Sequence, residues 1–268
     1  FQFHELSILD PAFEPVVADG SFDCVFHLAA NSDIQAGSRD RRVDLDKTFL
    51  TTWTTLELMA RHGVRQLVFA STSAIYGEVS EPTAEDFGPL IPVSFYGAAK
   101  LASEAYASAY SHRNEIQTWV FRFPNVVGSR ATHGVILDFV RRLIDEPSVL
   151  KVLGNGTQEK PYLYVHDLVG AMLFAWKHAK PAPYEVFNVG PQTATRVRSI
   201  AEIVVDKMGL SGKARIEYGE QPFGWPGDVP KFAYDLSKIT ALGWKPSGSS
   251  DDAVIRAAVD IIAEQTKA

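Results

Sequence analysis

Short apolar runs alternate along the chain with longer segments of helical periodicity. A continuous apolar run is typical of a strand that is buried on both faces. Four segments have this pattern, and we predict strands at residues 22–30, 66–71, 118–123 and 184–189. Alternation of such strands with helices is typical of a parallel sheet covered on both faces, the doubly wound α/β plan, whose ligands bind at the carboxyl ends of the strands.

Helical periodicity is clearest in four segments. We predict helices at residues 47–61, 94–110, 199–208 and 252–264. Gly63 follows the first of them, as glycine often does at the end of a helix. Gly, Pro and aromatic residues concentrate around residues 218–230, so we expect the last third of the chain to form a smaller, less regular lobe.

Composition limits the class of protein without naming a function. The 268 residues are 46% hydrophobic and 22% charged, as in ordinary globular domains, and no apolar run approaches a membrane span. A net charge of −6 argues against a nucleic-acid surface. The single cysteine, Cys24, excludes a disulfide framework and favours a reducing cytoplasm, and the first residues lack the pattern of a signal peptide. We therefore expect neither a nucleic-acid nor a membrane partner.

A Tyr–Lys pair at helical spacing is the clearest chemical feature. Tyr96 and Lys100 are four residues apart at the start of an Ala-rich helix, and Thr72 follows the strand at 66–71. The ammonium of Lys100 would lower the pKa of Tyr96, which could then act as a base on a substrate hydroxyl that Thr72 holds. A nicotinamide ring would accept the hydride. The alternative for the pair alone is an ordinary surface contact.

The order of motifs resembles the extended short-chain dehydrogenase/reductases, the NAD-dependent epimerase/dehydratase family typified by UDP-galactose 4-epimerase. The resemblance runs through nearly the whole chain: HLAA (27–30), STSAIYG (71–77), PVSFYGAAKLASE (92–104), RFPNVVG (122–128), GNG (154–156), YVHDL (164–168), FNVG (187–190), PGDV (226–229) and LGW (242–244). It implies a Rossmann sheet with a smaller C-terminal substrate lobe. It implies a dinucleotide-binding domain at 1–127 and 162–190, and a substrate-binding lobe at 128–161 and 191–268.

The resemblance also implies roles for single residues. The catalytic residues would be Thr72, Tyr96 and Lys100. NAD would contact Ala29, Ala30, Ser71, Tyr96, Lys100 and Phe123. The nucleotide sugar would contact Ser73, Asn125, Lys160, Trp225 and Asp228. No metal is implied, and the helices at 47–61 and 94–110 would pair in a homodimer, with Trp53, Leu58, Ala105 and Ala109 as surplus apolar residues.

Some assignments have structural alternatives, and some positions depart from the family. Asn125, a diphosphate ligand by resemblance, also suits a tight turn, and Lys160, in place of a family Arg, also suits an exposed surface. Trp225 stands where the family often has Arg, which removes a bidentate phosphate contact. Ser7 replaces a common Asp near the adenine, and Thr48 replaces a helix Asn near the cofactor.

The family's Gly-rich dinucleotide loop does not occur in this sequence. The family begins with a strand, a Gly-rich turn and a helix that holds the pyrophosphate, whereas Gly20 is the only glycine before the strand at 22–30. We therefore expect a Rossmann sheet that lacks its first strands. The native chain would then be longer, or this protein would be a truncated relative.

The two residues after Thr72 bear on the type of reaction. Dehydratases of the family have Asp and Glu there, whereas this chain has Ser73 and Ala74, which cannot act as general acids. The sequence thus favours NAD-dependent epimerisation at the 4-position of a nucleotide sugar. A 4-ketoreductase or dehydratase on the same scaffold, and a non-catalytic relative unable to hold NAD, are the alternatives.

Overall fold

The computed structural model describes residues 1–79, 81–221 and 233–266, and the chain forms two compact units. Unit 1 comprises residues 1–77, 85–122 and 175–187, and unit 2 comprises residues 78–84, 123–174 and 188–268.

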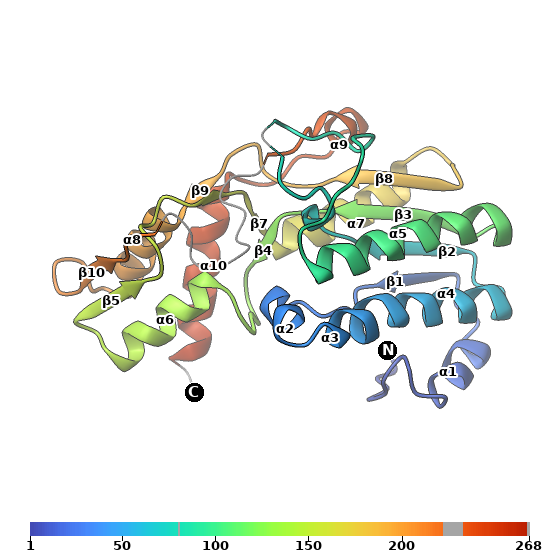
Figure 1. The fold of residues 1–268 in the computed structure, drawn as a ribbon, viewed down its shortest axis with the longest axis horizontal. Coiled ribbons are helices and arrows are strands. Elements are labelled where there is room, and N and C mark those ends of the chain that lie inside the picture. The colour runs from blue at the N-terminus through green and yellow to red at the C-terminus, as the bar shows by residue number, and fades with distance from the viewer. Residues whose placement is uncertain (80, 222–232, 267–268) are drawn as a thin grey trace. The chain divides into compact units, whose positions relative to one another are not determined.

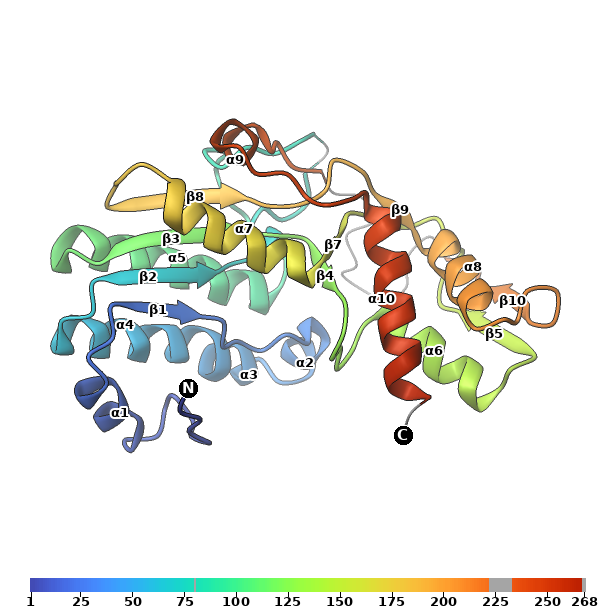
Figure 2. The ribbon, with the colours of Figure 1, turned by 180° about the vertical axis from the view of Figure 1, so that it is seen from behind.

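Unit 1 is built on a four-stranded parallel sheet. Its strand order is β1-β2-β3-β8, with β1 at Cys24–His27, β2 at Gln66–Ala70, β3 at Gln117–Arg122 and β8 at Tyr184–Asn188. The β1–β2 and β2–β3 pairs are parallel, and β8 points in the same direction in Figure 2. The predicted parallel sheet is confirmed. The strand expected at 22–30 is shorter, because only Cys24–His27 pairs with β2.

Helices α4 (Thr51–His62) and α5 (Phe95–Asn114) cover one face of this sheet (Figure 1). Successive strand side chains point to opposite faces, so alternate apolar residues reach these helices. The buried cluster on this face includes Leu67, Phe69 and Val120 of the strands and Leu56, Met59 and Ala107 of the helices. From the other side, the Trp176 ring meets Phe26 edge-on at 5.4 Å between centroids, and its Nε1 donates to Gln66 Oε1 at 2.9 Å.

Local sequence explains where the two covering helices begin and end. The side chain of Ser94 accepts a hydrogen bond from Gly97 N at 3.0 Å and so caps the start of α5. Gly63, with φ +76°, ends α4 in the left-handed conformation that glycine adopts easily. The helix predicted at 47–61 is regular only from Thr51, because Leu45–Leu50 forms a wide π-helical turn after α3 (Arg42–Asp44). Unit 1 also contains α1 (Phe13–Asp19) and α2 (Ile34–Arg39).

Unit 2 combines short strand pairs with a cluster of packed helices. The parallel pairs are β4 (Asn125–Val127) with β7 (Tyr162–Tyr164) and β5 (Val149–Val152) with β10 (Arg215–Tyr218), and the antiparallel pair is β6 (Glu159–Lys160) with β9 (Thr195–Arg196). The apolar faces of α6 (Val135–Asp145), α8 (Val197–Lys207) and α10 (Ser250–Gln265) form one buried cluster with β5 and β7. Two further helices are α7 (Val165–His178) and α9 (Ser237–Leu242).

The two units divide the chain differently from the domains expected from sequence. Residues 78–84, 123–127, 162–174 and 188–190, expected in the dinucleotide-binding domain, belong to unit 2. Two of these segments contain β4 and β7, which pair with each other rather than with a strand of the four-stranded sheet. Helix α7 passes from one unit to the other at Ala175. No helix within the described residues is both long enough and apolar enough to cross a membrane.

Candidate active site

Thr72 lies in the turn that follows β2. Its backbone is extended, with φ −159° and ψ 155°, and it caps a single 3-10 turn at Ser73–Ile75. The Thr72 hydroxyl oxygen accepts a hydrogen bond from Ala74 N at 3.2 Å, and the residue is 8% exposed. A hydroxyl at the carboxyl end of a parallel strand occupies the edge where doubly wound sheets bind ligands.

Tyr96 and Lys100 lie on one face of α5, since residues four apart in a helix are neighbours. The hydroxyl of Tyr96 is hydrogen-bonded to Thr72. The Lys100 side chain is buried, and its Nζ donates to the carbonyl oxygen of Ala70 at 2.6 Å and lies 4.8 Å from the centroid of the Phe69 ring. The structure therefore brings the three residues selected from sequence together at the end of β2.

Gly97 allows the start of α5 to approach the turn after Thr72. A Cβ atom at this position would lie 2.6 Å from the carbonyl oxygen of Ala74 and 3.0 Å from Pro92. Because the nearest of these is a backbone atom, the contact cannot be relieved by a side-chain rotation. The glycine between Tyr96 and Lys100 is thus required by the distance that separates this helix from the Thr72 turn.

Burial dominates the pKa values of both titratable residues. It raises the pKa of Tyr96 to about 12, although the hydrogen bond with Thr72 acts in the opposite direction, and the charge of Asp44 raises it further. It lowers the pKa of Lys100 to about 8, partly offset by the nearby carboxylate of Glu104. The expectation of a lowered pKa for Tyr96 is wrong for this structure, because burial outweighs the hydrogen bond with Thr72, and the ammonium of Lys100 is bonded to Ala70.

His27 ends β1 and is a buried, neutral residue. Its Nε2 lies 3.1 Å from Thr52 Oγ1, and its Nδ1 lies 3.4 Å from Thr55 Oγ1. Burial, together with the charge of Lys100, lowers the pKa of His27 to about 3. With both nitrogens facing α4 hydroxyls and the ring stacked on Phe69, His27 joins the sheet to its covering helix.

The loop after β1 is held by Thr48 and Asp44, and of these two the sequence had indicated only Thr48. Thr48 is fully buried and accepts a hydrogen bond from Asn31 N at 3.0 Å, and Asp44 accepts one from Asn31 Nδ2 at 2.8 Å. This arrangement fixes the loop immediately after Ala30, which is half-buried, and Ala29, which is exposed. The Thr48 substitution noted in the sequence therefore has a structural role here.

The other candidate residues lie in several places. Ser71 is fully buried and its hydroxyl donates to Glu104. Ser73 is half-buried in the turn after Thr72. In unit 2, Asn125 is exposed at the start of β4 and pairs with Tyr162, two residues after Lys160, and Phe123 is half-buried. Trp225 and Asp228 lie outside the described residues.

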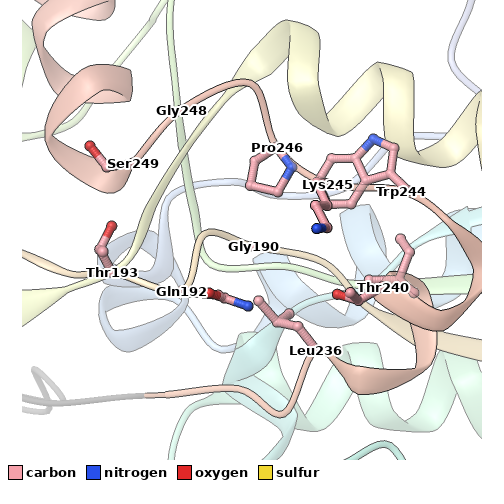
Figure 3. Close-up of a pocket in the computed structure, with 11 residues that line it drawn as sticks. Gly190, Gln192, Thr193, Leu236, Thr240, Trp244, Lys245, Pro246, Gly248 and Ser249 are labelled. Atoms are coloured by element: carbon pink, nitrogen blue, oxygen red, sulfur yellow. The ribbon is translucent and has the colours of Figure 1, made fainter.

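Unit 2 contains a pocket of about 280 Å³ that is lined by none of the candidate catalytic, cofactor or substrate residues (Figure 3). It lies between α9, the segment after it and the segment that follows β8. Its wall combines apolar groups with neutral hydroxyl and amide groups and one ammonium, and is formed by Gly190, Gln192, Thr193, Leu236, Ile239, Thr240, Trp244, Lys245, Pro246, Gly248 and Ser249.

Comparison with known proteins identifies the family. Residues 1–190 match the family described as the NAD dependent epimerase/dehydratase family. The chain belongs to this family. It is similar to a UDP-glucuronate 4-epimerase of Thermodesulfobacterium geofontis, with 30% identity over 260 residues that cover 96% of this chain and 78% of the relative.

Solved structures of family members have the same fold. A crystal structure of UDP-galactose 4-epimerase matches with a TM-score of 0.83 and 37% identity, covering 94% of this chain and 81% of the other. A UDP-glucuronic acid 4-epimerase from Bacillus cereus, in complex with UDP-glucuronic acid and NAD, matches with a TM-score of 0.84 and 26% identity, covering 99% of this chain and 82% of the other. The likeness to these solved structures therefore extends beyond residue 190.

Proposed function

We propose that this protein is an NAD-dependent nucleotide-sugar 4-epimerase whose substrate is a UDP-hexose or UDP-hexuronic acid. The observation that carries the proposal is the hydrogen bond between the hydroxyls of Thr72 and Tyr96, with Lys100 one helical turn further along α5. The names of the similar proteins, UDP-glucuronate and UDP-galactose 4-epimerases, support the same reaction and the same nucleotide.

Tyr96 would move the proton of the reaction. Its phenolate accepts the proton of the sugar 4-hydroxyl and later returns it, while Thr72 holds the same sugar oxygen. A pKa of about 12 leaves the phenol of Tyr96 protonated at neutral pH, the state that returns a proton. The hydrogen bond from Thr72 favours the phenolate, the state that removes one.

The donors of unit 1 fit the nicotinamide–ribose end of NAD. Lys100 has three N–H donors, and one of them is used on Ala70, so the ammonium can also donate to ribose hydroxyls. Ala29 and Ala30 have small side chains at the carboxyl end of β1, which permit close approach of a cofactor. The chemistry that bound NAD would supply there is a reversible acceptor for the hydride of the sugar carbon.

In unit 2, Asn125 and Lys160 would bind the diphosphate of the substrate. Two hydrogen-bond donors, one of them charged, are suited to phosphate oxygens. Their neighbouring positions on β4 and just before β7 support a shared ligand. Unit 1 would then bind the dinucleotide and unit 2 the nucleotide sugar.

The active form would be a homodimer that pairs α4 and α5 of the two copies. Trp53 and Tyr106 are 40% and 45% exposed, and Ala105 and Ala109 are exposed beside Tyr106 on α5. Leu58, which the sequence placed in this surface, is instead 5% exposed and belongs to the core. Exposed aromatic residues on adjacent helices are typical of surfaces that associate.

Product analysis tests the reaction directly. The protein is incubated with NAD and UDP-glucose, UDP-glucuronic acid or dTDP-glucose in separate reactions, and products are identified by NMR and mass spectrometry. We expect a 4-epimer of unchanged mass from a UDP-sugar. A product lighter by one water would show a dehydratase, which the absence of acids at Ser73 and Ala74 argues against. Absence of any product with all three sugars would contradict the proposal.

A further inference from the structure

Glu104 continues the line of functional residues along α5. It follows Lys100 by four residues and Tyr96 by eight, and it is 3% exposed. A buried carboxylate is costly unless it is paired and hydrogen-bonded. Its partners therefore indicate what this position does.

The Glu104 carboxylate joins α5 to the ends of two strands. It accepts a hydrogen bond from the hydroxyl of Ser71, which follows β2 directly and immediately precedes Thr72. It also accepts three from Arg122, the last residue of β3, at 3.1 Å and 3.2 Å from Nε and 2.6 Å from Nη2. The charged groups of this pair are almost fully buried, with side-chain exposures of 4% and 5%.

Arg122 extends the connection to the far end of the Thr72 turn. Its Nη1 donates to the hydroxyl of Tyr76 at 3.0 Å and to the carbonyl oxygen of Glu85 at 2.9 Å, and its guanidinium lies 5.1 Å from the centroid of the Tyr76 ring. Tyr76 ends the 3-10 turn that Thr72 begins. The turn is thus held on one side through Ser71 and on the other through Tyr76, and both contacts lead to the same ion pair.

Glu104 also acts on the charge of Lys100. Burial disfavours the ammonium of Lys100. Among the charged groups that the structure describes, the carboxylate of Glu104 favours it. The other groups next to Lys100 are the carbonyl oxygen of Ala70, the ring of Phe69 and His27, whose own pKa of about 3 leaves it neutral. Among the charged groups of the described residues, Glu104 is therefore the one that favours the protonated form of Lys100.

We propose that Glu104, paired with Arg122, is a positioning residue for the reaction: it fixes the turn that carries Thr72 against α5 and provides the buried negative charge that sustains the ammonium of Lys100. The proposal rests on the epimerase function proposed above. A buried ion pair is weak support for stability, since apolar pairs of similar volume often stabilise as well or better. This pair connects α5 to the ends of β2 and β3, so its position favours a role in placing the Thr72 turn and in setting the charge of Lys100.

The first test removes both charges of the pair without leaving one of them unpaired. Glu104→Gln combined with Arg122→Met avoids the severe cost of a single buried charge. We expect a folded protein whose kcat is reduced roughly tenfold or more, the effect of misplacing catalytic groups, while KM changes little. Glu57→Gln is the matched control, because Glu57 accepts a hydrogen bond from Tyr110 between α4 and α5, and none of the hydrogen bonds described for Lys100 or the Thr72 turn involves it.

The second test measures Lys100 without any substrate. The pKa of Lys100 is followed by NMR of a protein with ¹³C-labelled lysine side chains, and its signal is assigned by its absence in Lys100→Met. In Glu104→Gln the pKa should fall by roughly one unit or more below the value of about 8, as expected on loss of a nearby opposite charge. In the double variant the fall should be smaller, because the positive charge of Arg122 is lost as well. This measurement does not require the proposed reaction, so it stays informative if no epimerase activity is found.

Two milder variants separate position from charge. Glu104→Asp retains the charge but shortens the side chain, and Ser71→Ala leaves the ion pair intact while releasing one side of the turn. Both should lower kcat severalfold and leave the pKa of Lys100 near that of the wild type. Wild-type kcat in folded Glu104→Asp and Ser71→Ala proteins would overturn the positioning role. An unchanged pKa of Lys100 in folded Glu104→Gln would overturn the electrostatic one. If Glu104→Gln does not fold, the double variant is titrated in its place, and a pKa of Lys100 at or above that of the wild type would then overturn it.

Discussion

The ammonium of Lys100 donates a 2.6 Å hydrogen bond to the carbonyl oxygen of Ala70, the last residue of β2. This contact places the positive charge at the carboxyl end of the strand that leads to Thr72, inside a site where burial disfavours it. The buried ammonium therefore lowers the stability of the fold, and a role in catalysis would explain why it is retained.

Replacing Lys100 by Met should remove activity and increase stability at neutral pH. The folded pKa of about 8 lies below the ordinary value of 10.5, so the unfolded chain holds this proton more tightly than the folded one. Below pH 8 the buried charge then costs roughly 3 kcal/mol, and the cost declines as the pH rises from 8 to 10.5. Urea denaturation should show Lys100→Met more stable than wild type at pH 7, with a smaller difference at pH 10.

The same variant has a control at the surface. Lys47 is exposed in the π-helical turn before α4, and Lys47→Met should change stability by less than about 0.5 kcal/mol at either pH. A Lys100→Met protein that is less stable than wild type at pH 7 would mean that the hydrogen bond to Ala70 outweighs the cost of burying the charge.

Tyr96→Phe should reduce kcat by a factor of roughly a hundred to ten thousand, the usual effect of removing a general acid or base. The fold should persist, since the substitution retains the ring and removes only the hydroxyl that bonds to Thr72. Tyr110→Phe is the control: this tyrosine is on the same helix and its hydroxyl donates to Glu57, outside the site. Steady-state kinetics and thermal unfolding of both variants test the role, and a Tyr96→Phe enzyme with wild-type kcat would exclude it.

Gly97→Ala should destabilise the protein by about 1–3 kcal/mol, as forced contacts in packed regions do. The added Cβ would lie 2.6 Å from the carbonyl oxygen of Ala74, so either α5 or the Thr72 turn must shift, and activity should fall with stability. Gly170, inside α7, has no atom within 4 Å of an added Cβ, and Gly170→Ala should stabilise by up to about 1 kcal/mol. Equal effects of the two substitutions on the free energy of unfolding would contradict the close approach at Gly97.

The sequence predicted the parts of the fold that depend on long periodic segments. The strands of unit 1 and the helices α4, α5, α8 and α10 lie within a few residues of their expected bounds, because burial of an apolar face leaves a strong pattern. The pairing of β4 with β7 was not predictable, since each strand has only three residues. Both strands belong to unit 2, outside the four-stranded sheet.

The candidate site was predictable in its residues and not in its contacts. The spacing of Tyr96 and Lys100 is local, so sequence reveals it, whereas the bond from Lys100 to Ala70 depends on how α5 packs on β2. The role of Glu104 had a signal in the sequence, because it continues the i, i+4 series of Tyr96 and Lys100 along one helix face. Its partner Arg122 could be found only once the ends of neighbouring strands were placed.

The proposed dimer depends on the aromatic residues exposed on α4 and α5. The Tyr106 ring meets Phe49 edge-on at 5.1 Å between centroids, and Trp53 is four residues beyond Phe49, so these side chains are well placed to form one apolar surface. Replacing Trp53 and Tyr106 together by Glu would bury two charges in a paired interface, which is strongly unfavourable. Sedimentation equilibrium at micromolar concentration should show a dimer for the wild type and a monomer for this double variant.

Val259 provides the control for this experiment. It is 50% exposed on α10 in unit 2, so Val259→Glu adds a charge at an exposed apolar position outside the proposed interface. This variant should remain dimeric, which separates a specific interface from a general effect of added charge. If the wild type is a monomer at these concentrations, or if the Trp53 and Tyr106 double variant remains a dimer, α4 and α5 do not form the interface. The exposed aromatic residues would then need another partner, because apolar side chains grouped on two adjacent helices gain stability only where something covers them.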